Sequence, residues 1–338
     1  MIIELMLDFQ IATSKNKLNT EDIIAVTSRS FSKNDFLINE LRNLYSSIIL
    51  NNSGETLKGD KLIEFLKPAT KAIIGIEKIS DSELSQLPKL RVISKYGVGL
   101  NNLNLELLKS YNIKLGFTDG VNKQSVAEMA LTLILTGLKK IKANDVDILN
   151  GNWSQEKGSE FFGKTIGLLG FGNIGKKLSS LIQPFNCNIL FFDEKDYTDR
   201  DISNISIDLN LNPKLIRQLP LDLVLSESDI LSIHLPLSKE TANLIAAPEF
   251  IKLKSSVCIV NTARGGIVNE EDLYNFLDKN PTAFAGFDVY DEEPAFNNPL
   301  LKLSNFFGTS HRSSLTTEGI NAMGIAAING LDDNINIT

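Results

Sequence analysis

Arg264, Glu293 and His311 are three side chains whose chemistry would be complementary at a catalytic site. An imidazole titrates near neutral pH, so His311 could donate or accept a proton during a reaction. A carboxylate such as Glu293 could orient that imidazole and stabilise its protonated form. The planar guanidinium of Arg264 suits two-point recognition of a substrate carboxylate. Each residue alone could equally be an ordinary surface or structural side chain, so the hypothesis depends on their occurring together.

All three residues follow apolar segments that predict β-strands. In an open parallel sheet, ligands bind at the carboxyl ends of the strands, so residues just beyond a strand are well placed to bind them. The strand candidates are Val257–Asn261 before Arg264, Ala285–Val289 before Glu293, and Asn305–Gly308 before His311. The only other histidine, His234, closes a further strand candidate, Ile230–His234.

A glycine-rich turn follows the strand candidate Thr165–Leu169, where Gly170, Gly172 and Gly175 have the spacing G-x-G-x-x-G. Such glycines allow a tight turn, a close approach of backbone to a pyrophosphate, and helix-on-strand packing. The N–H groups at the start of the next helix favour phosphate. Asp193 lies 18 residues beyond Gly175, where a carboxylate accepts the ribose hydroxyls and repels a 2′-phosphate. The sequence therefore favours NAD over NADP, although the glycines alone could form a structural turn.

Short apolar runs alternate with segments of helical period along the chain, which predicts an α/β fold with parallel strands. The predicted helices cover Asn34–Tyr45, Ser125–Ile141 and Thr316–Ile328, and the residues before Ile23 are interpreted as an arm or extension. The remaining strand candidates are Ile23–Thr27, Ser47–Leu50, Ala72–Ile76, Leu90–Ser94 and Asn188–Phe192.

Length and composition exclude several classes of protein. At roughly 150 residues per domain, 338 residues indicate about two domains. A formal charge of −7 without a basic run argues against a nucleic-acid partner. Two cysteines, Cys187 and Cys258, make neither a disulfide framework nor a metal site, which favours a reducing, cytoplasmic compartment. We expect no signal peptide and no membrane span.

The ordered motifs resemble the D-isomer-specific 2-hydroxyacid dehydrogenase family, the group that includes D-3-phosphoglycerate and D-lactate dehydrogenases. The resemblance extends from about Ile23 to Ile328. The matching segments are the glycine turn, ILSIHLPLSKETANLI from Ile230, NTARGGIVNE from Asn261, DVYDEEP from Asp288, YGVGLNN from Tyr96 and NKQSVAE from Asn122. The resemblance implies hydride transfer between NAD(H) and C2 of a 2-hydroxy or 2-keto acid, with a 3-phosphoglycerate-like substrate as one option.

The resemblance also implies a role for individual residues. Arg264, Glu293 and His311 would be catalytic, with Arg264 on the substrate carboxylate and Glu293 paired to His311. The cofactor would contact Gly170, Gly172, Asn173, Ile174, Gly175, Asp193, His234, Pro236, Thr262, Ala263 and Asp288. The substrate would contact Lys95, Tyr96, Gly97 and Val98.

The family architecture implies two lobes, with a Rossmann NAD-binding domain inserted into a flavodoxin-like substrate domain. The substrate domain would comprise residues 1–120 plus 312–338, and the NAD-binding domain residues 121–311. The apolar helix Ser125–Ile141 resembles the dimer element of the family, which implies a homodimer, although core packing would explain its apolar character equally well.

Departures from the family pattern surround His311. Ser310 replaces the usual proline before it, and Arg312 and Ser313 follow it. Arg312 either points into solvent or supplies a cation for a second anionic group of the substrate, a role that Lys95 could share. An alternative function is a catalytically idle NAD-sensing interaction protein of the same fold, because the family fold includes a transcriptional corepressor.

Overall fold

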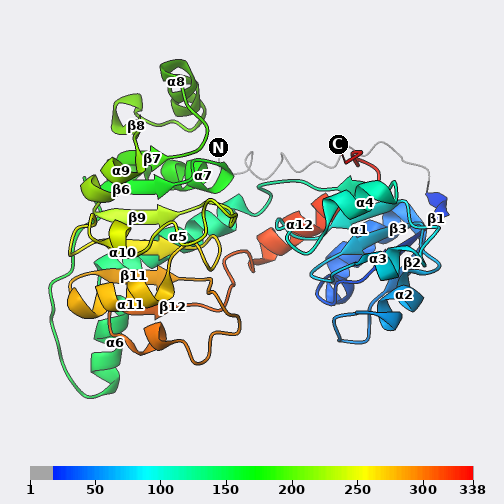
Figure 1. Cartoon of the computed structure of the whole chain (residues 1–338), viewed down its shortest axis with the longest axis horizontal. Helices are drawn as coiled ribbons and strands as arrows, with labels where there is room; N and C mark the ends of the chain where they lie inside the picture. Colours follow the sequence, from blue (N-terminus) through cyan, green and yellow to red (C-terminus); the bar gives the residue numbers. More distant parts are fainter. Residues whose placement is uncertain (1–17, 338) are drawn as a thin grey trace. The chain divides into compact units, whose positions relative to one another are not determined.

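The computed structural model describes residues 18–337, which form two compact units (Figure 1). Unit 1 joins the chain up to Val121 to the segment from Thr317 onward, and unit 2 spans Asn122–Thr316. The chain therefore leaves unit 1, builds the whole of unit 2 and then returns.

Unit 1 contains a five-stranded parallel sheet in the order β2-β1-β3-β4-β5, which is the flavodoxin-like order. Its strands are β1 (Asn19–Val26), β2 (Tyr45–Leu50), β3 (Lys71–Ile74), β4 (Val92–Lys95) and β5 (Lys114–Gly116). Its helices are α1 (Asp35–Leu44), α2 (Asp60–Leu66), α3 (Asp81–Leu84), α4 (Leu105–Ser110) and α12 (Thr317–Asn329). Two apolar clusters flank the sheet, one with residues of α1 and α12 and the other with residues of α2, α3 and α4.

A charged network stabilises the amino end of this sheet. Lys71 Nζ lies 3.0 Å from Asp22 Oδ2 and 2.5 Å from Asp332 Oδ1, and Arg91 lies 2.7 Å from the other oxygen of Asp22. Burial alone would raise the pKa of Asp22, but hydrogen bonds from Lys71 and neighbouring side chains outweigh it and leave the pKa below its usual value. The tail beyond α12 is thereby held to the strands.

Unit 2 contains a seven-stranded parallel sheet in the order β12-β11-β10-β9-β6-β7-β8. The order reverses between β6 and β9, as in doubly wound dinucleotide-binding folds. The strands are β6 (Thr165–Leu169), β7 (Asn188–Phe192), β8 (Ile216–Gln218), β9 (Ile230–Ile233), β10 (Cys258–Asn261), β11 (Phe284–Phe287) and β12 (Phe306–Gly308). The predicted fold class, α/β with a Rossmann-type and a flavodoxin-like sheet, is confirmed.

Helices cover both faces of the second sheet. Residues of α5 (Lys123–Leu138) and α7 (Asn173–Ile182) join one apolar cluster, and residues of α9 (Leu221–Glu227), α10 (Ala247–Phe250) and α11 (Glu270–Lys279) join the other. In Figure 1, α8 (Asp199–Asp208) lies at one end of unit 2 and α6 (Ile141–Leu149) at the other. No helix among residues 18–337 is both long and apolar enough to cross a bilayer.

The structure corrects two sequence predictions and adds two strands that were not predicted. The helix predicted over Ser125–Ile141 ends at Leu138, and Lys140, with a left-handed φ of 53°, separates it from α6. The supposed arm before Ile23 includes the start of β1 at Asn19, whereas residues 1–17 lie outside the described part. The strands β5 and β8 were not predicted, because three-residue strands with charged or polar members show no apolar run.

The chain returns from unit 2 to unit 1 between Thr316 and Thr317, five residues beyond the boundary near 311/312 that the family architecture implies. Hydrogen bonds hold the intervening residues in unit 2. Ser313 N and Oγ donate to Asp288, and the hydroxyl groups of Ser125 and Thr316 lie 2.7 Å apart.

Candidate active site

The strand register of unit 2 aligns the ends of six strands in one row. The paired residues in this row are Phe192, Leu169, Ile233, Asn261, Phe287 and Gly308, in the spatial order β7-β6-β9-β10-β11-β12. The residues that follow them are Asp193, Gly170, His234, Thr262, Asp288 and Thr309. The predicted cofactor and catalytic segments of unit 2 therefore leave the sheet at the same level of its carboxyl edge.

The glycine turn between β6 and α7 presents backbone rather than side chains. Gly170 has φ +96°, and a Cβ there would lie 2.8 Å from the carbonyl oxygen of His234. A Cβ on Gly175 would collide with the carbonyl oxygen of Gly170, so the helix can approach the strand only with glycine. Gly172 is the N-cap of α7, and a Cβ there would meet nothing within 4 Å. Asn173 and Ile174 form the first turn of α7.

Asp193, just beyond β7, accepts a hydrogen bond from the backbone of the same turn. One carboxylate oxygen accepts a hydrogen bond from Phe171 N at 2.6 Å, and the other accepts from Lys195 N at 3.0 Å. Gln218 of β8 supports this loop by donating to Lys195 O at 2.8 Å and accepting from Tyr197 N at 2.8 Å. The carboxylate is therefore held beside the glycine turn, where the sequence predicts the ribose.

Two buried polar atoms at neighbouring strand ends have no hydrogen-bond partner within the described residues. They are His234 Nδ1, beyond β9, and Thr262 Oγ1, beyond β10. The other ring nitrogen of His234 lies 2.9 Å from Ser232 Oγ, and burial lowers the pKa of this histidine to about 3, so its ring is neutral. Buried polar groups normally have partners. The two orphan atoms and the open face at Gly172 therefore fit a polar ligand such as a dinucleotide.

The next two predicted cofactor residues lie in the same strand-end loops. Ala263 N donates to Asn261 Oδ1 at 3.0 Å, which fixes the turn after β10. The carbonyl oxygen of Pro236, beyond β9, accepts a hydrogen bond from Thr241 at 2.6 Å. Neither residue offers a charged group, so each could contact a cofactor only through its backbone or apolar atoms.

His311 and Glu293 form a hydrogen-bonded pair. His311 Nδ1 lies 2.8 Å from Glu293 Oε2, and the two side chains are 48% and 37% exposed. The second oxygen of Glu293 accepts from Tyr290 N at 3.1 Å, which orients the carboxylate. The imidazole nitrogen Nε2 has no hydrogen bond to any other residue in the range 18–337. Nε2 is therefore available to exchange a proton with a substrate.

Arg264 lies in the loop after β10, and hydrogen bonds connect this loop to the Glu293 loop. Asn261 Nδ2 donates to Arg264 O at 2.9 Å, and Gly266 N donates to Asp291 Oδ1 at 2.5 Å. Asp291 N in turn donates to Glu270 Oε1 at 2.8 Å, at the start of α11. The fold thus brings the arginine loop and the glutamate loop together through Asp291 and Glu270. Both residues lie within the quoted segments NTARGGIVNE and DVYDEEP, but sequence reasoning assigned neither a role, because their pairing depends on how the two loops meet.

Asp288 follows β11 and is completely buried. Its carboxylate accepts hydrogen bonds from Thr309, Arg312 and Ser313, all in the segment that carries His311. The sequence predicts a contact with the cofactor for Asp288, whereas its observed partners belong to the histidine loop.

The four predicted substrate residues lie in unit 1, in the segment that begins at the last residue of β4. Lys95 is 7% exposed, and its ammonium donates to Gly75 O and to Asn102 Oδ1, the latter at 2.9 Å. Burial raises the pKa of Tyr96, whose ring packs edge-on against Phe31. Gly97 has φ +119°, and Val98 follows it in the same loop. The ammonium of Lys95 thus has partners within unit 1.

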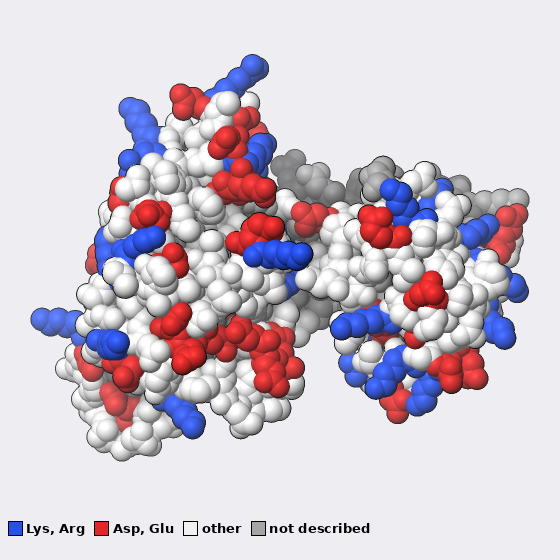
Figure 2. Space-filling view, viewed as in Figure 1, with Lys and Arg blue, Asp and Glu red and all other residues white. Residues whose placement is uncertain are grey.

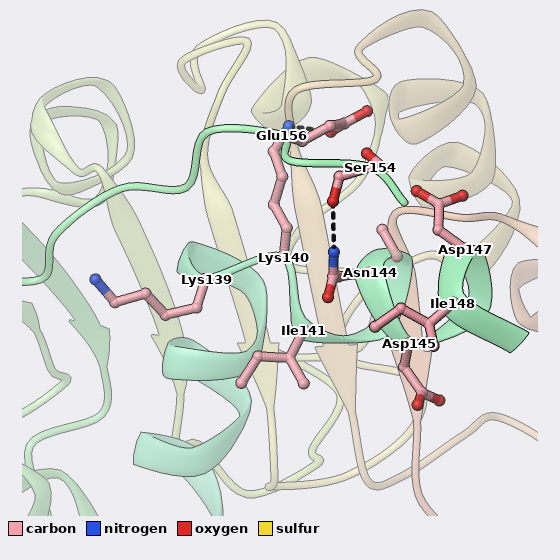
Figure 3. A pocket seen from close by; sticks show the side chains of 10 residues that line it. Lys139, Lys140, Ile141, Asn144, Asp145, Asp147, Ile148, Ser154 and Glu156 are labelled. Atoms are coloured by element: carbon pink, nitrogen blue, oxygen red, sulfur yellow. Dashed lines mark hydrogen bonds and ion pairs between the residues drawn. The ribbon is translucent and has the colours of Figure 1, made fainter. Parts of the chain in front are cut away.

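A surface pocket of about 380 Å³ lies between α6 and the segment that follows it (Figure 3). Lys140 reaches Glu156 at 2.7 Å and Asn144 donates to Ser154 O at 3.0 Å across this pocket. None of its lining residues belongs to the strand-end loops. On the face in Figure 2, acidic side chains gather in the lower half of unit 2, and no broad basic patch is visible.

Comparisons with known proteins match unit 2 to an NAD-binding domain. The family model described as D-isomer specific 2-hydroxyacid dehydrogenase, NAD binding domain, matches residues 131–313. A hydroxypyruvate reductase of Thermotoga maritima is 32% identical over 286 residues, which cover 82% of this chain and 89% of that protein. A D-3-phosphoglycerate dehydrogenase of Methanocaldococcus jannaschii is 29% identical over 284 residues, but the matched part is only 52% of its length. The solved structure of a D-2-hydroxyisocaproate dehydrogenase superposes with a TM-score of 0.82 at 17% identity, covering 94% of this chain and 100% of that one.

Proposed function

The chain belongs to the D-isomer-specific 2-hydroxyacid dehydrogenase family, as an NAD-dependent oxidoreductase of 2-hydroxy and 2-keto acids, and we propose that Arg264, Glu293 and His311 are its catalytic residues. The observation that carries this assignment is the His311–Glu293 pair, with Nδ1 bonded to the carboxylate and Nε2 without a partner among residues 18–337.

When bound, the reduced nicotinamide supplies the hydride that adds to C2 of the keto acid. Negative charge then develops on the carbonyl oxygen, and protonated His311 donates the proton of Nε2 to that oxygen. Glu293 stabilises the imidazolium before this transfer and keeps Nε2 directed outward. The products are the 2-hydroxy acid and the oxidised cofactor, and His311 regains its proton from solvent because half of its side chain is exposed.

Binding of the carboxylate is assigned to Arg264, because its guanidinium matches a carboxylate at two points. Within the described part of the chain, the guanidinium donates a hydrogen bond to the adjacent carbonyl oxygen of Ala263, at 2.6 Å. The backbone N–H groups of Gly97 and Val98 are proposed to bind the same carboxylate. Lys95 is assigned a supporting role, because its ammonium ties the Gly97 loop to Gly75 and Asn102.

The dinucleotide is assigned to the carboxyl edge between β7 and β10. The N–H groups at the start of α7 would bind the pyrophosphate, and Asp193 would accept the ribose hydroxyls. The neutral His234 and Thr262 would direct their orphan polar atoms to the cofactor. Asn173, Ile174, Pro236, Ala263 and Asp288 complete the predicted cofactor surface.

A substrate with a second anionic group, such as 3-phosphoglycerate, would require a second cation. Arg312 is exposed beside His311, and its guanidinium has no partner among the residues that the structure describes. This favours Arg312 over Lys95 as the residue that would recognise such a group.

The assignment is tested by NADH oxidation with phosphohydroxypyruvate, hydroxypyruvate, glyoxylate, pyruvate and oxaloacetate at neutral pH. We expect turnover with at least one keto acid, and a loss of about 10²- to 10⁴-fold in His311→Ala, the usual contribution of a general acid. NADH binding should persist in that variant. A wild-type protein that binds NADH but reduces none of these acids would instead support the idle NAD-sensing alternative.

The assembly is proposed to be a homodimer formed through α6 rather than α5. Apolar residues of α5 pack fully or partly buried in the core of unit 2, whereas α6 has no buried residue. Exposed apolar side chains on α6 and just beyond it include Ile141 (53%), Ile148 (50%), Leu149 (78%) and Trp153 (81%). Clusters of this kind mark interaction sites.

A cytoplasmic location is also proposed, and the two free, buried cysteines support it.

A further inference from the structure

Four hydrogen bonds converge on the buried carboxylate of Asp288, and all come from the segment 309–313. Oδ1 accepts from Thr309 Oγ1 at 2.5 Å and from Arg312 N at 2.8 Å. Oδ2 accepts from Ser313 N at 2.8 Å and from Ser313 Oγ at 2.5 Å. A carboxylate has about four lone-pair sites, so these donors use the full accepting capacity of Asp288.

His311 lies in the middle of this segment with a left-handed backbone. Its φ is +49°, a conformation that is unfavourable for a residue with a side chain. Its N–H donates to the carbonyl oxygen of Asp288 at 2.8 Å. Asp288 therefore holds the chain before, at and after the histidine. Backbone strain of this kind persists only where the surroundings enforce it.

The same backbone conformation determines where the imidazole lies. His311 Nδ1 meets Glu293 at 2.8 Å, and Glu293 belongs to the loop that starts at Asp288. Without the bonds to Asp288, the segment could relax to an extended or right-handed conformation, and the imidazole would move away from Glu293. A shift of about 1 Å at a reacting group can lower a rate about 10²-fold.

We propose that Asp288, Ser313 and Thr309 form a clamp that positions His311, so that the carboxylate of Asp288 also acts on the reaction through the histidine. This inference rests on the proposed catalytic role of His311. Ser313 and Thr309 are positioning residues, because their hydroxyl groups donate to the carboxylate that holds the loop.

The test compares variants that remove single hydroxyl groups from the clamp. Thr309→Val removes a hydroxyl at nearly constant shape, and Ser313→Ala removes the other. One hydrogen bond to a charged group corresponds to a factor of about ten, so we expect the double variant to lose roughly tenfold or more in kcat. The Kd of NADH, from fluorescence titration, should stay within about twofold of the wild type. Thr309→Ser keeps the hydroxyl and should retain wild-type kcat.

Two controls separate positioning from loss of folded protein. Ser314→Ala changes a neighbouring serine outside the clamp and should leave kcat unchanged. In a His311→Ala background, Ser313→Ala should cause no further loss of the residual turnover, because both changes act through one residue. The keto acid is the one that the wild type reduces fastest in the panel.

Several results would overturn the clamp. If Ser313→Ala lowered turnover by the same factor in the wild type and in the His311→Ala background, the effect would be generally structural. A raised Kd for NADH at unchanged kcat would show that these hydrogen bonds serve cofactor binding instead. An unchanged kcat in both hydroxyl variants would show that the bonds do not position His311. If His311→Ala itself retained full turnover, the proposed function would fail, which is a different result from failure of the clamp alone.

Discussion

Replacing Gly172 with alanine should weaken NADH binding while leaving the fold intact. A Cβ at this position meets nothing within 4 Å, and the φ of −81° is one that alanine adopts freely. Alanine is a poorer N-cap than glycine, by up to about 1 kcal/mol. The loss of glycine's freedom in the unfolded chain offsets this by about 0.4–1 kcal/mol. The free energy of unfolding should therefore change by less than about 1 kcal/mol.

The effect on cofactor binding should be much larger, because the methyl group would stand where the pyrophosphate must approach the backbone. Hydrogen bonds to a charged group are worth about 1.5–3 kcal/mol, which corresponds to a roughly 10- to 150-fold increase in Kd. NADH fluorescence titration measures this increase, and thermal unfolding measures stability.

Gly175→Ala is the matched control, since its Cβ would collide with the carbonyl oxygen of Gly170. Overpacking of this kind costs about 1–3 kcal/mol, so this variant should unfold at a lower temperature. A Gly172→Ala protein that is fully folded and binds NADH with the wild-type Kd would refute the assignment of the pyrophosphate to this turn.

Three further changes have defined outcomes. Asp193→Ala should raise the Kd of NADH at least about tenfold and relax the preference over NADPH, whereas the exposed neighbour Glu194→Ala should do neither; unchanged cofactor constants in Asp193→Ala would contradict the ribose assignment. Asp22→Asn should destabilise the protein by roughly 1.5–3 kcal/mol at pH 7, the contribution of one hydrogen bond to a charged group, because it leaves Lys71 with one partner fewer. The pKa of Asp22 is lowered in the fold. Its contribution to the free energy of unfolding is therefore present above its unfolded pKa of about 3.9 and is lost as the pH falls through the folded pKa. Urea unfolding at several pH values should show the stabilities of the wild type and Asp22→Asn converging only below about pH 4. Leu149→Glu should convert a dimer to a monomer in sedimentation experiments, and a wild-type monomer would contradict the α6 interface.

Local sequence signals were enough to predict the strands β6 and β7 and the glycine turn of unit 2. The bounds of β6 and β7 agree with the predicted ranges Thr165–Leu169 and Asn188–Phe192. Each is a largely apolar run that is followed by turn residues, and the glycine spacing identifies the turn between β6 and α7. The pairing of Glu293 with His311 was also predictable, although only from the resemblance, since no local rule connects residues 18 positions apart.

Features that depend on pairing between distant segments could not be predicted from the sequence patterns. β5 and β8 are strands only because a neighbour supplies hydrogen bonds, since Lys114–Gly116 and Ile216–Gln218 have no apolar run of their own. The helix break at Lys140 depends on one left-handed residue. The burial of Lys95 against Gly75 and Asn102 depends on how β3 and β4 pair.

The sequence by itself determined which residue types are available for chemistry and in which order they follow the strands. Composition and motif spacing are properties of neighbouring residues, and they identified the glycine turn and the two histidines. Only the tertiary structure decided how these residues meet. The strand register placed the six strand ends in one row, and the buried carboxylate of Asp288 bound the backbone around His311. Both depend on hydrogen bonds between segments far apart in the chain, which no local pattern encodes.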